Sequence, residues 1–476
     1  MKFFIDGQWT PSTSGRAAPI RNPATGETID FVPLGDAADA DRALRSAQAA
    51  FGAWRARPMA DRAKLQHAAA AEMRKRLDEL AHSITLEVGR PLAGARSEIE
   101  RSADLLDYFA EEGLRLTGDI PLLNLPDERV MVIKEPVGVV VAITPFNYPI
   151  TLLTFKIGAA LIAGCAVVAK PAEDTPLTTL TLAELFHGVG FPPGVFNVVT
   201  GAGGEIGRAL VEHPIPRKVS FTGSAEGGKR IAALAAQTNK RVTLELGGQC
   251  PAIVSDDADL DVAVPALVKQ SFDNAGQFCY RINRLYVQRG VFDAFGERFA
   301  AGARALKVGN GLTAGCQMGP LVNDGGLQKS EAHVRDALAK GAQLIVGGRR
   351  LTGGEFDAGR FFPPTVLTHT DHSMLIMSEE TFGPVVGIMP VDTLEEAVSH
   401  ANNSRYGLAA YVFTGNMGTA LRIAEQCEAG SVWVNGIHRS YNQVPFGGFK
   451  ESGLGREKSR YGLEEYLELK TIYLTL

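Results

Sequence analysis

The 476-residue chain is predicted to be an α/β protein with parallel, doubly wound sheets. The runs 137–143 and 166–170 are β-branched and apolar along their whole length, which is typical of strands covered on both faces. Helical patterns separate these runs, which indicates strand–helix alternation. A chain of this length is also expected to divide into about two or three domains.

The individual elements can be assigned in order along the chain. Residues 1–35 are rich in turns, and residues 36–116 carry apolar side chains at three- and four-residue steps, which predicts helices. The next elements that we expect are strands 137–143, 166–170, 195–200 and 218–221, with helices 152–164 and 178–186. Further strands are expected at 252–254, 285–287, 343–346 and 432–434, which indicates a second α/β domain.

The chain ends in a strand pattern in which Ile472, Leu474 and Leu476 alternate with Thr and Tyr. An exposed apolar edge of this kind favours pairing with another strand. Residues 129–134, which follow an interruption at Pro126, have similar β character. From pattern alone, pairing within the chain and pairing with a second subunit are equally open.

Composition excludes several classes of function. With 48 basic and 53 acidic residues and a net charge of −5, there is no electrostatic case for binding nucleic acid or an anionic membrane. The longest apolar stretch, 157–169, is shorter than the roughly 20 residues that span a bilayer. Five cysteines are too few for a disulfide framework, so we expect a soluble protein of the cytoplasm. No metal site is expected.

One of the five cysteines, Cys279, has the setting of a reactive thiol. Gly276 precedes it and Arg281 follows it, which indicates a turn instead of a core helix. A buried cysteine is more often an inert small hydrophobic residue, so this motif alone does not decide between the two.

Two further polar residues, Glu245 and Asn147, have local settings that suggest a chemical role. Glu245 lies in an apolar strand that ends at two glycines, where burial would raise the pKa of its carboxyl and make it a usable base. Asn147 lies between Pro145 and Pro149 in a rigid turn, where its amide could donate to a developing oxyanion. The alternatives are a paired structural glutamate and an ordinary turn asparagine.

Two loops are candidates for binding phosphate. The glycine-rich run 201–207 follows a strand, but Ile206 occupies the place of the third glycine of a dinucleotide fingerprint. The segment Phe221-Thr222-Gly223-Ser224 precedes a helix, so it offers either backbone N–H groups to a phosphate or an N-cap.

Taken together and in this order, these motifs resemble the NAD(P)-dependent aldehyde dehydrogenase superfamily over almost the whole chain, nearest its succinate-semialdehyde dehydrogenase-like branch. The resemblance rests on seven segments: 145–149, 170–173, 221–224, 245–248, 276–279, 379–384 and 445–453. It implies a Rossmann-like NAD-binding domain (1–116 and 137–246), a catalytic α/β domain (247–445) and a small β oligomerisation arm (117–136 and 458–476). A homodimer or homotetramer is therefore expected.

The resemblance also implies a role for individual residues. Cys279 matches the nucleophile, Asn147 the oxyanion donor together with the Cys279 backbone N–H, and Glu245 the base that activates water. The residues implied to bind the cofactor are Thr144, Pro145, Phe146, Lys170, Glu173, Gly203, Gly207, Thr222, Gly223, Ser224, Leu246, Gly247, Glu380 and Phe382. Because a carboxylate at Glu173 would accept from a free ribose 2′-OH and repel a 2′-phosphate, we expect NAD to be preferred over NADP.

The substrate is less closely defined. The branch has arginines for a substrate carboxylate at two places that hold Phe155 and Asp273 in this chain. Aromatic side chains (Tyr148, Phe155, Phe278 and Tyr441) instead predict an apolar tunnel. Arg281 and Arg439 could still supply a positive charge to the substrate, although a solvated surface role is favoured for each. The sequence therefore favours a broad or apolar aldehyde, with succinate semialdehyde as the alternative. A CoA-acylating enzyme and a non-enzymatic binding protein are the rival classes, and the presence of Glu245 argues against both.

Overall fold

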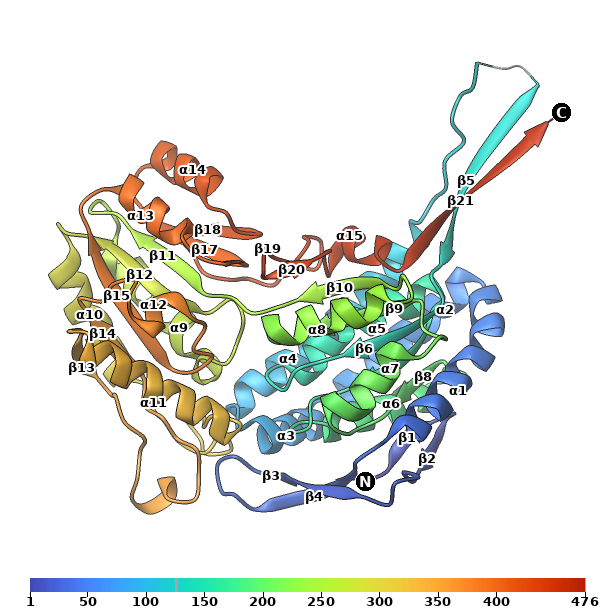
Figure 1. Cartoon of the computed structure of the whole chain (residues 1–476), viewed down its shortest axis with the longest axis horizontal. Helices are drawn as coiled ribbons and strands as arrows, with labels where there is room; N and C mark the ends of the chain where they lie inside the picture. Colours follow the sequence, from blue (N-terminus) through green and yellow to red (C-terminus); the bar gives the residue numbers. More distant parts are fainter. Residues whose placement is uncertain (125–126, 476) are drawn as a thin grey trace.

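Two large sheets form the body of the molecule (Figure 1). The computed structural model describes residues 1–124 and 127–475, so Pro126 and Leu476 lie outside the described residues. The first sheet has eight strands in the order β2-β1-β8-β7-β6-β9-β10-β20. Its parallel centre consists of β6 (Val139–Ile143), β7 (Ala166–Lys170), β8 (Phe196–Val198), β9 (Lys218–Thr222) and β10 (Arg241–Glu245). Its antiparallel edges are β1 (Phe3–Ile5), β2 (Gln8–Thr10) and β20 (Gly453–Leu454).

Helices cover both faces of this sheet, as the uninterrupted apolar strands predict. Val139 and Val141 of β6 pack into one core with α1, while Val140 and Ala142 pack into the other core with α5. The helices of this half are α1 (Ala37–Ala56), α2 (Met59–Lys75), α3 (Leu77–Val88), α4 (Leu92–Leu114), α5 (Pro149–Ala163), α6 (Leu177–Gly188), α7 (Arg208–Glu212) and α8 (Ala225–Ala236). A π-helical turn, η1 (Gly203–Gly207), leads into α7.

The second sheet has seven strands in the order β13-β14-β15-β12-β11-β17-β18, and only β13 at its edge is antiparallel. Its strands are β11 (Cys250–Val254), β12 (Ile282–Gln288), β13 (Gln343–Val346), β14 (Thr365–Thr368), β15 (Val385–Val391), β17 (Ala409–Phe413) and β18 (Ser431–Val434). The helices of this half are α9 (Leu260–Phe272), α10 (Phe292–Arg304), α11 (Asp324–Ala339), α12 (Leu375–Ser378), α13 (Leu394–Asn402) and α14 (Met417–Gln426), with 3-10 turns η2 (Asp273–Gly276) and η3 (Gly354–Phe356). The expected second α/β domain is therefore present.

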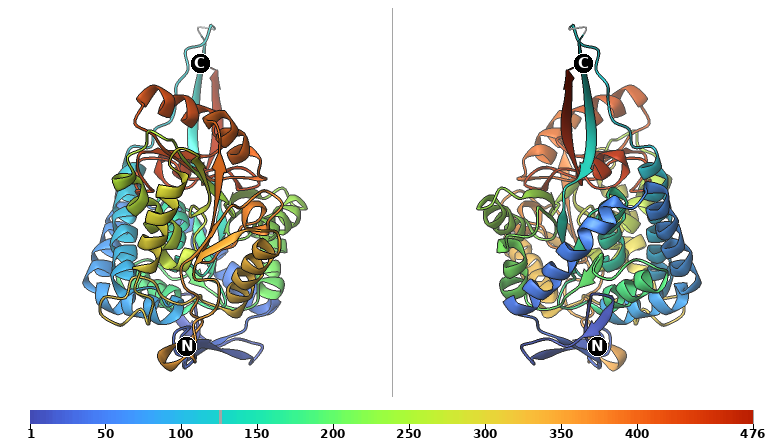
Figure 2. Two further views of the ribbon diagram at one scale, coloured as in Figure 1. Left: turned by 90° about the vertical axis from the view of Figure 1, so that its left-hand side faces the viewer. Right: turned by 90° about the vertical axis from the view of Figure 1, so that its right-hand side faces the viewer.

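A two-stranded arm projects from the body of the molecule (Figures 1 and 2). It pairs β5 (Glu128–Pro136) with β21 (Leu467–Thr475) in antiparallel register within one chain. The short helix α15 (Ser459–Glu464) precedes β21. Leu469 and Tyr473 on β21 are 68% and 74% exposed. The apolar end strand thus has a partner on one edge, and the side chains of its outer face meet solvent.

Two parts of the fold differ from the sequence prediction or lie outside it. The turn-rich segment 1–35 contains four short strands, the last two being β3 (Ala17–Arg21) and β4 (Thr28–Pro33), which pair with each other. A further small pair joins β16 (Tyr406–Gly407) to β19 (Phe449–Lys450). Among the described residues, no helix is long and apolar enough to cross a membrane.

Candidate active site

Two pockets meet at Cys279. Pocket A has an empty volume of about 620 Å³ and pocket B one of about 700 Å³. Both are lined by Asn147, Leu152 and Cys279, and these are the three residues that the pockets share. The thiol predicted to be reactive and the amide predicted to donate to an oxyanion therefore lie at one junction.

The strand order explains why these loops converge. Along the first sheet, the chain runs from β6 to β7 and β8 on one side and then returns to β9 and β10 on the other. In a parallel sheet, ligands bind beyond the carboxyl ends of the strands at such a reversal. The loops that follow β6, β9 and β10 here contribute Pro145–Asn147, Thr222–Ser224 and Leu246–Gly247 to pocket B.

Cys279 lies in a turn after α9, as its neighbours predicted. Asn274 and Ala275 in η2 have left-handed backbones, with φ of 48° and 55°. Gly276 also has a positive φ, and a Cβ there would approach the carbonyl oxygen of Gly383 to 2.5 Å, so glycine is required. Burial, with smaller contributions from Cys250 and Glu245, raises the pKa of the Cys279 thiol well above its usual value. The resting side chain is therefore a neutral thiol at neutral pH.

Asn147 is held by contacts on both sides of its loop. The Asn274 side-chain amide donates to the backbone oxygen of Asn147 at 3.2 Å, which joins this loop to the turn that carries Cys279. Directly after the loop, buried Glu98 accepts the backbone N–H groups of Ile150 and Thr151 at 3.0 and 3.1 Å and forms an ion pair with Arg90. The first turn of α5 is thereby capped by a side chain from α4.

Glu245 ends β10 and is only 1% exposed. Neither of its carboxylate oxygens has a hydrogen-bond partner among the described residues. Burial first, and repulsion from Glu457 second, raise the pKa of the Glu245 carboxyl well above its usual value, while Lys156 opposes this. Glu457 itself is paired with Lys156. A buried carboxyl that is unpaired and has a raised pKa is suited to accept or hold a proton.

Nine of the fourteen residues implied to bind a cofactor line pocket B: Pro145, Phe146, Thr222, Gly223, Ser224, Leu246, Gly247, Glu380 and Phe382. Glu380 accepts the backbone N–H of Gly248 at 2.9 Å. A Cβ on Gly247 would approach Glu380 Oε2 to 2.5 Å, so a side chain there would displace this carboxylate. Ser224 also caps α8 by accepting from the N–H of Gly227 at 3.1 Å, so the N-cap alternative is confirmed and phosphate binding stays a prediction.

The other five implied cofactor residues do not line pocket B but gather near the ends of β6 and β7. Glu173 accepts the backbone N–H of Gly203 at 2.7 Å and the ammonium of Lys170 at 3.2 Å. The backbone N–H of Thr144 donates to the oxygen of Lys170, and Gly207 lies against the Lys170 side chain. Burial lowers the pKa of Lys170. These residues form a second polar cluster on the same edge of the sheet.

Pocket A is aromatic, as the sequence suggested, but the set of residues differs. Tyr148 and Phe155 line it, together with Tyr280 and Phe446. The prediction was wrong for two residues: Phe278 is buried with its ring edge-on to Tyr280, and the side chain of Tyr441 is about half exposed. Neither Phe278 nor Tyr441 lines the pocket.

Charged residues in this region also differ from expectation. Arg281 is fully buried and donates to the backbone oxygen of Val385, so its predicted surface role is wrong. Local sequence could not show that β15 would cover it. Arg439 is exposed, as predicted. Asp273 lines a separate cavity beside α9 and is absent from the lining of pocket A.

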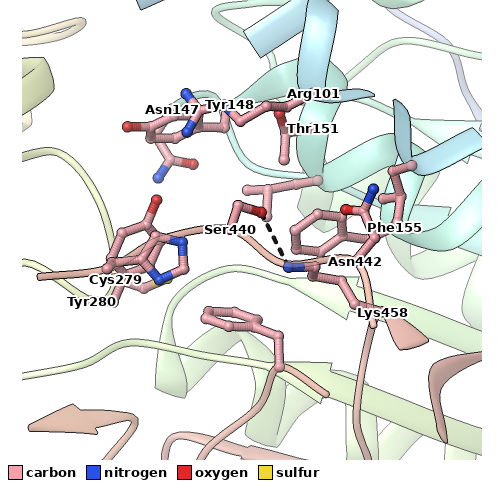
Figure 3. A pocket seen from close by; sticks show the side chains of 14 residues that line it. Arg101, Asn147, Tyr148, Thr151, Phe155, Cys279, Tyr280, Ser440, Asn442 and Lys458 are labelled. Atoms are coloured by element: carbon pink, nitrogen blue, oxygen red, sulfur yellow. Dashed lines mark hydrogen bonds between the residues drawn. The ribbon is translucent and has the colours of Figure 1, made fainter. Parts of the chain in front are cut away.

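Sequence reasoning missed the two cations of pocket A, Arg101 on α4 and Lys458 before α15. Figure 3 places Asn147, Cys279 and Tyr280 at one end of this pocket and Phe155, Asn442 and Lys458 at the other, with Ser440 between them. The only available signal was that Lys458 closely follows the recognised segment 445–453.

Comparisons with known proteins agree with this geometry. The aldehyde dehydrogenase family model matches residues 9–472. A 3-sulfolactaldehyde dehydrogenase from Pseudomonas putida is 44% identical over 471 residues, which cover 99% of this chain and 96% of that protein. The NADP(+) succinate-semialdehyde dehydrogenase GabD of Escherichia coli is 43% identical over 472 residues, covering 99% and 97%. The crystal structure of betaine aldehyde dehydrogenase from Staphylococcus aureus in complex with NAD+ superposes with a TM-score of 0.98 at 39% identity, covering 100% of this chain and 94% of that one.

These similarities confirm the predicted fold and the nearness to the semialdehyde dehydrogenase branch. They extend over almost the whole chain, and they accompany a cysteine at the junction of two pockets. The chain belongs to the aldehyde dehydrogenase family and is an oxidoreductase that uses NAD(P) as its cofactor.

Proposed function

We propose that this enzyme oxidises an aldehyde to the carboxylic acid through a covalent intermediate on Cys279. The observation that carries the proposal is the position of Cys279 and Asn147 at the meeting point of pockets A and B. An aldehyde that enters through pocket A would reach the thiol from one side, and a group held in pocket B would reach it from the other. This arrangement suits the transfer of a group between two bound molecules.

The residues around pocket B fit NAD(P). Glu380 lies against the backbone of Gly247 and Gly248, where a carboxylate can accept from ribose hydroxyls. Ser224 stands at the N-terminus of the twelve-residue helix α8, which favours a pyrophosphate. The Lys170–Glu173 cluster farther along the sheet edge suits the adenosine ribose. When bound, NAD(P)+ supplies the acceptor for a hydride.

The first step forms a bond from the Cys279 sulfur to the aldehyde carbon, with the thiol proton passing to a base. The carbonyl becomes an oxyanion, which we assign to the Asn147 side-chain amide and the Cys279 backbone N–H. Loss of a hydride from the same carbon restores the carbonyl and leaves a thioester on Cys279.

Glu245 is assigned to the second half of the reaction. Its raised pKa and its lack of a partner suit a carboxylate that takes a proton from a water molecule. The oxygen of that water bonds to the thioester carbon, the carbon–sulfur bond breaks, and the carboxylic acid leaves. Aldehyde, NAD(P)+ and water thus become acid, NAD(P)H and a proton.

Two variants test these assignments. Cys279→Ala should abolish aldehyde-dependent formation of NAD(P)H while cofactor binding is retained. Glu245→Gln should slow hydrolysis, so that the thioester accumulates and is seen as added mass on the intact protein. Turnover in assays without CoA would exclude a CoA-acylating enzyme. If the Gln variant turns over at the wild-type rate, Glu245 is not the base, and if the wild type oxidises no aldehyde, the binding-protein alternative holds.

Three finer statements also belong to the proposal. The Glu173 carboxylate favours NAD over NADP because it would repel a 2′-phosphate. The exposed face of β21 favours assembly into a homodimer or homotetramer through the arm. A mechanism that needs a free Cys279 thiol, in a chain whose five cysteines are all unbonded, suits the reducing cytoplasm.

Two features of pocket A support different classes of substrate. Its aromatic walls support the predicted apolar aldehyde. Its two cations, Lys458 and Arg101, support the alternative, an aldehyde that carries a negative charge.

A further inference from the structure

Lys458 has a backbone conformation that suits glycine. Its φ is 62° and its ψ is 173°, a region that is essentially restricted to glycine because a Cβ is crowded there. The following residue, Ser459, also has a positive φ of 54°. A lysine at this position therefore costs conformational free energy that a glycine would not, and its side chain must provide a compensating advantage.

The Lys458 side chain is directed into pocket A. The residue is 3% exposed, and its ammonium donates a hydrogen bond to Ser440 Oγ at 3.1 Å and lies 5.8 Å from the centre of the Phe155 ring (Figure 3). Within the described part of the chain, Lys458 forms no ion pair, and none of the residues that line pocket A is Asp or Glu. Ser440 is a neutral partner, so the charge of this ammonium is uncompensated.

A buried cation without a counter-ion is unfavourable. Burial, and to a lesser degree repulsion from Arg101, lowers the pKa of Lys458 to about 8. The other titratable side chains that line the pocket add no negative charge at neutral pH. Burial lowers the pKa of His438 to about 3 and raises the pKa values of Tyr148 and Tyr280 above the usual value of a tyrosine. An anionic group on a bound ligand would supply the counter-ion that Lys458 lacks in pocket A.

The position of the ammonium defines which part of a ligand it would meet. Figure 3 shows the stem of Lys458 on the side of pocket A away from Cys279 and Asn147, with its ammonium reaching back to Ser440 between the two sides. An aldehyde whose carbonyl reaches Cys279 would extend its other end towards Lys458. Arg101, which also forms no ion pair within the described residues, adds a second positive charge to the same pocket.

We infer that Lys458, held by Ser440, determines specificity by binding an anionic group at the far end of the aldehyde substrate. This inference rests on the proposed function. The substrate class is a short aldehyde that ends in a carboxylate or a sulfonate, two groups that share the chemistry of a compact oxyanion. The two arginines expected from the resemblance are absent, at Phe155 and Asp273, and the charge is supplied instead from α4 and from the segment before α15.

The experiment compares matched pairs of aldehydes of equal chain length. Succinate semialdehyde is paired with butanal, and glutarate semialdehyde with pentanal, while a sulfonated aldehyde distinguishes sulfonate from carboxylate. Specificity constants are measured with saturating NAD+ for the wild type, Lys458→Met and Lys458→Gly. The Met variant keeps the length and apolar stem of the side chain, and the Gly variant removes the backbone strain. Lys64→Met, at an exposed lysine on α2, is the control.

The wild type is expected to prefer the anionic member of each pair at least tenfold. Both Lys458 variants should lose about tenfold or more in kcat/KM for the anionic aldehydes, mainly through KM, and change less than about threefold for butanal and pentanal. Lys458→Gly should be at least as thermally stable as the wild type, so lost activity there cannot be attributed to misfolding. Lys64→Met should match the wild type.

Two results would overturn the inference. If the variants keep the wild-type ratio of kcat/KM for the anionic aldehyde to kcat/KM for the neutral one, Lys458 does not discriminate by charge, although the proposed oxidation stands. If kcat/KM of the variants falls equally for both members of a pair, Lys458 supports the structure of the pocket and does not determine specificity. Failure of the wild type to oxidise any of these aldehydes would instead refute the proposed function itself.

Discussion

The loop that carries Asn147 is positioned by Glu98, and replacing this glutamate by alanine is expected to affect both stability and turnover. Glu98 is fully buried on α4, accepts two N–H groups at the start of α5, and is paired with Arg90, which is also buried. Glu98→Ala would leave the guanidinium without a counter-ion and the first turn of α5 without a cap.

The magnitude follows from these contacts. Removing one partner of a buried ion pair costs about 3–5 kcal/mol. Each lost acceptor for a backbone N–H costs about 1 kcal/mol. This cost is not fully additive to that of the lost ion pair, because the same carboxylate makes all the contacts. We therefore expect Glu98→Ala to lower the free energy of unfolding by about 4 kcal/mol. Since Asn147 directly precedes this helix, kcat should also fall about 10- to 100-fold.

Urea titration gives the free energy of unfolding, and steady-state assays give kcat. Glu98→Gln keeps an oxygen that can accept from Ile150 and Thr151 but loses the charge opposite Arg90, so it should fall between the wild type and Glu98→Ala. Glu100→Ala, at an exposed site on the same helix, should change stability by less than about 0.5 kcal/mol.

A double variant makes the reasoning refutable. Arg90→Met should cost less in the Glu98→Ala background than in the wild type, because it removes the cation that has lost its counter-ion. Strictly additive costs, or a Glu98→Ala variant within about 1 kcal/mol of the wild type, would show that the pair does not hold this loop.

Four further predictions address the site and the arm. Because Lys458 has a pKa lowered to about 8, it is protonated below that pH, and the preference for anionic over neutral aldehydes should fall as pH rises through about 8; a constant ratio from pH 7 to 9.5 would contradict this. Since the pKa of the Cys279 thiol is raised, the rate at which iodoacetamide alkylates it in the cofactor-free enzyme should still rise above pH 9, with Cys279→Ala as the background, and a plateau near pH 7 would be inconsistent. Glu173→Ala should raise the ratio of kcat/KM for NADP to that for NAD about tenfold, and an unchanged ratio would show that this carboxylate does not exclude the 2′-phosphate. Tyr473→Asp on the exposed face of β21 should reduce the molar mass measured by light scattering, and a monomeric wild type would disprove assembly through the arm.

The parts of the fold that could be predicted are those in which local pattern and burial agree. The strand 166–170 was predicted to the residue because both of its faces are covered, so every side chain is apolar or small up to Lys170. Strands β1 to β4 were missed because they are short and antiparallel and because β2 to β4 are partly exposed, so only the three apolar residues of β1 stand out among the turn residues. The two-residue strand β20 has no sequence signal at all.

The same distinction applies to the site. Cys279, Asn147 and Glu245 could be chosen as candidates because each has an unusual local setting: a glycine turn, a proline-flanked loop and a carboxylate in an apolar strand. Lys458 could not, because its burial depends on packing against residues more than three hundred positions earlier, such as Phe155. Arg281 was misassigned for the same reason, since a charged residue after a turn looks exposed until β15 is placed over it.

The pairing of β10 with β20 has a consequence for how the chain folds. Glu245 ends β10 and is paired in register with Gly453, whose backbone fits so closely that a Cβ would come within 2.3 Å of the Leu244 carbonyl oxygen. The outer edge of β10 therefore has no strand partner until the distant segment that contains β20 reaches it. A chain that lacks β20 would present an unpaired edge beside Glu245, and such edges favour aggregation. Closure of the sheet edge beside Glu245 thus requires contact between two segments that lie far apart in the sequence.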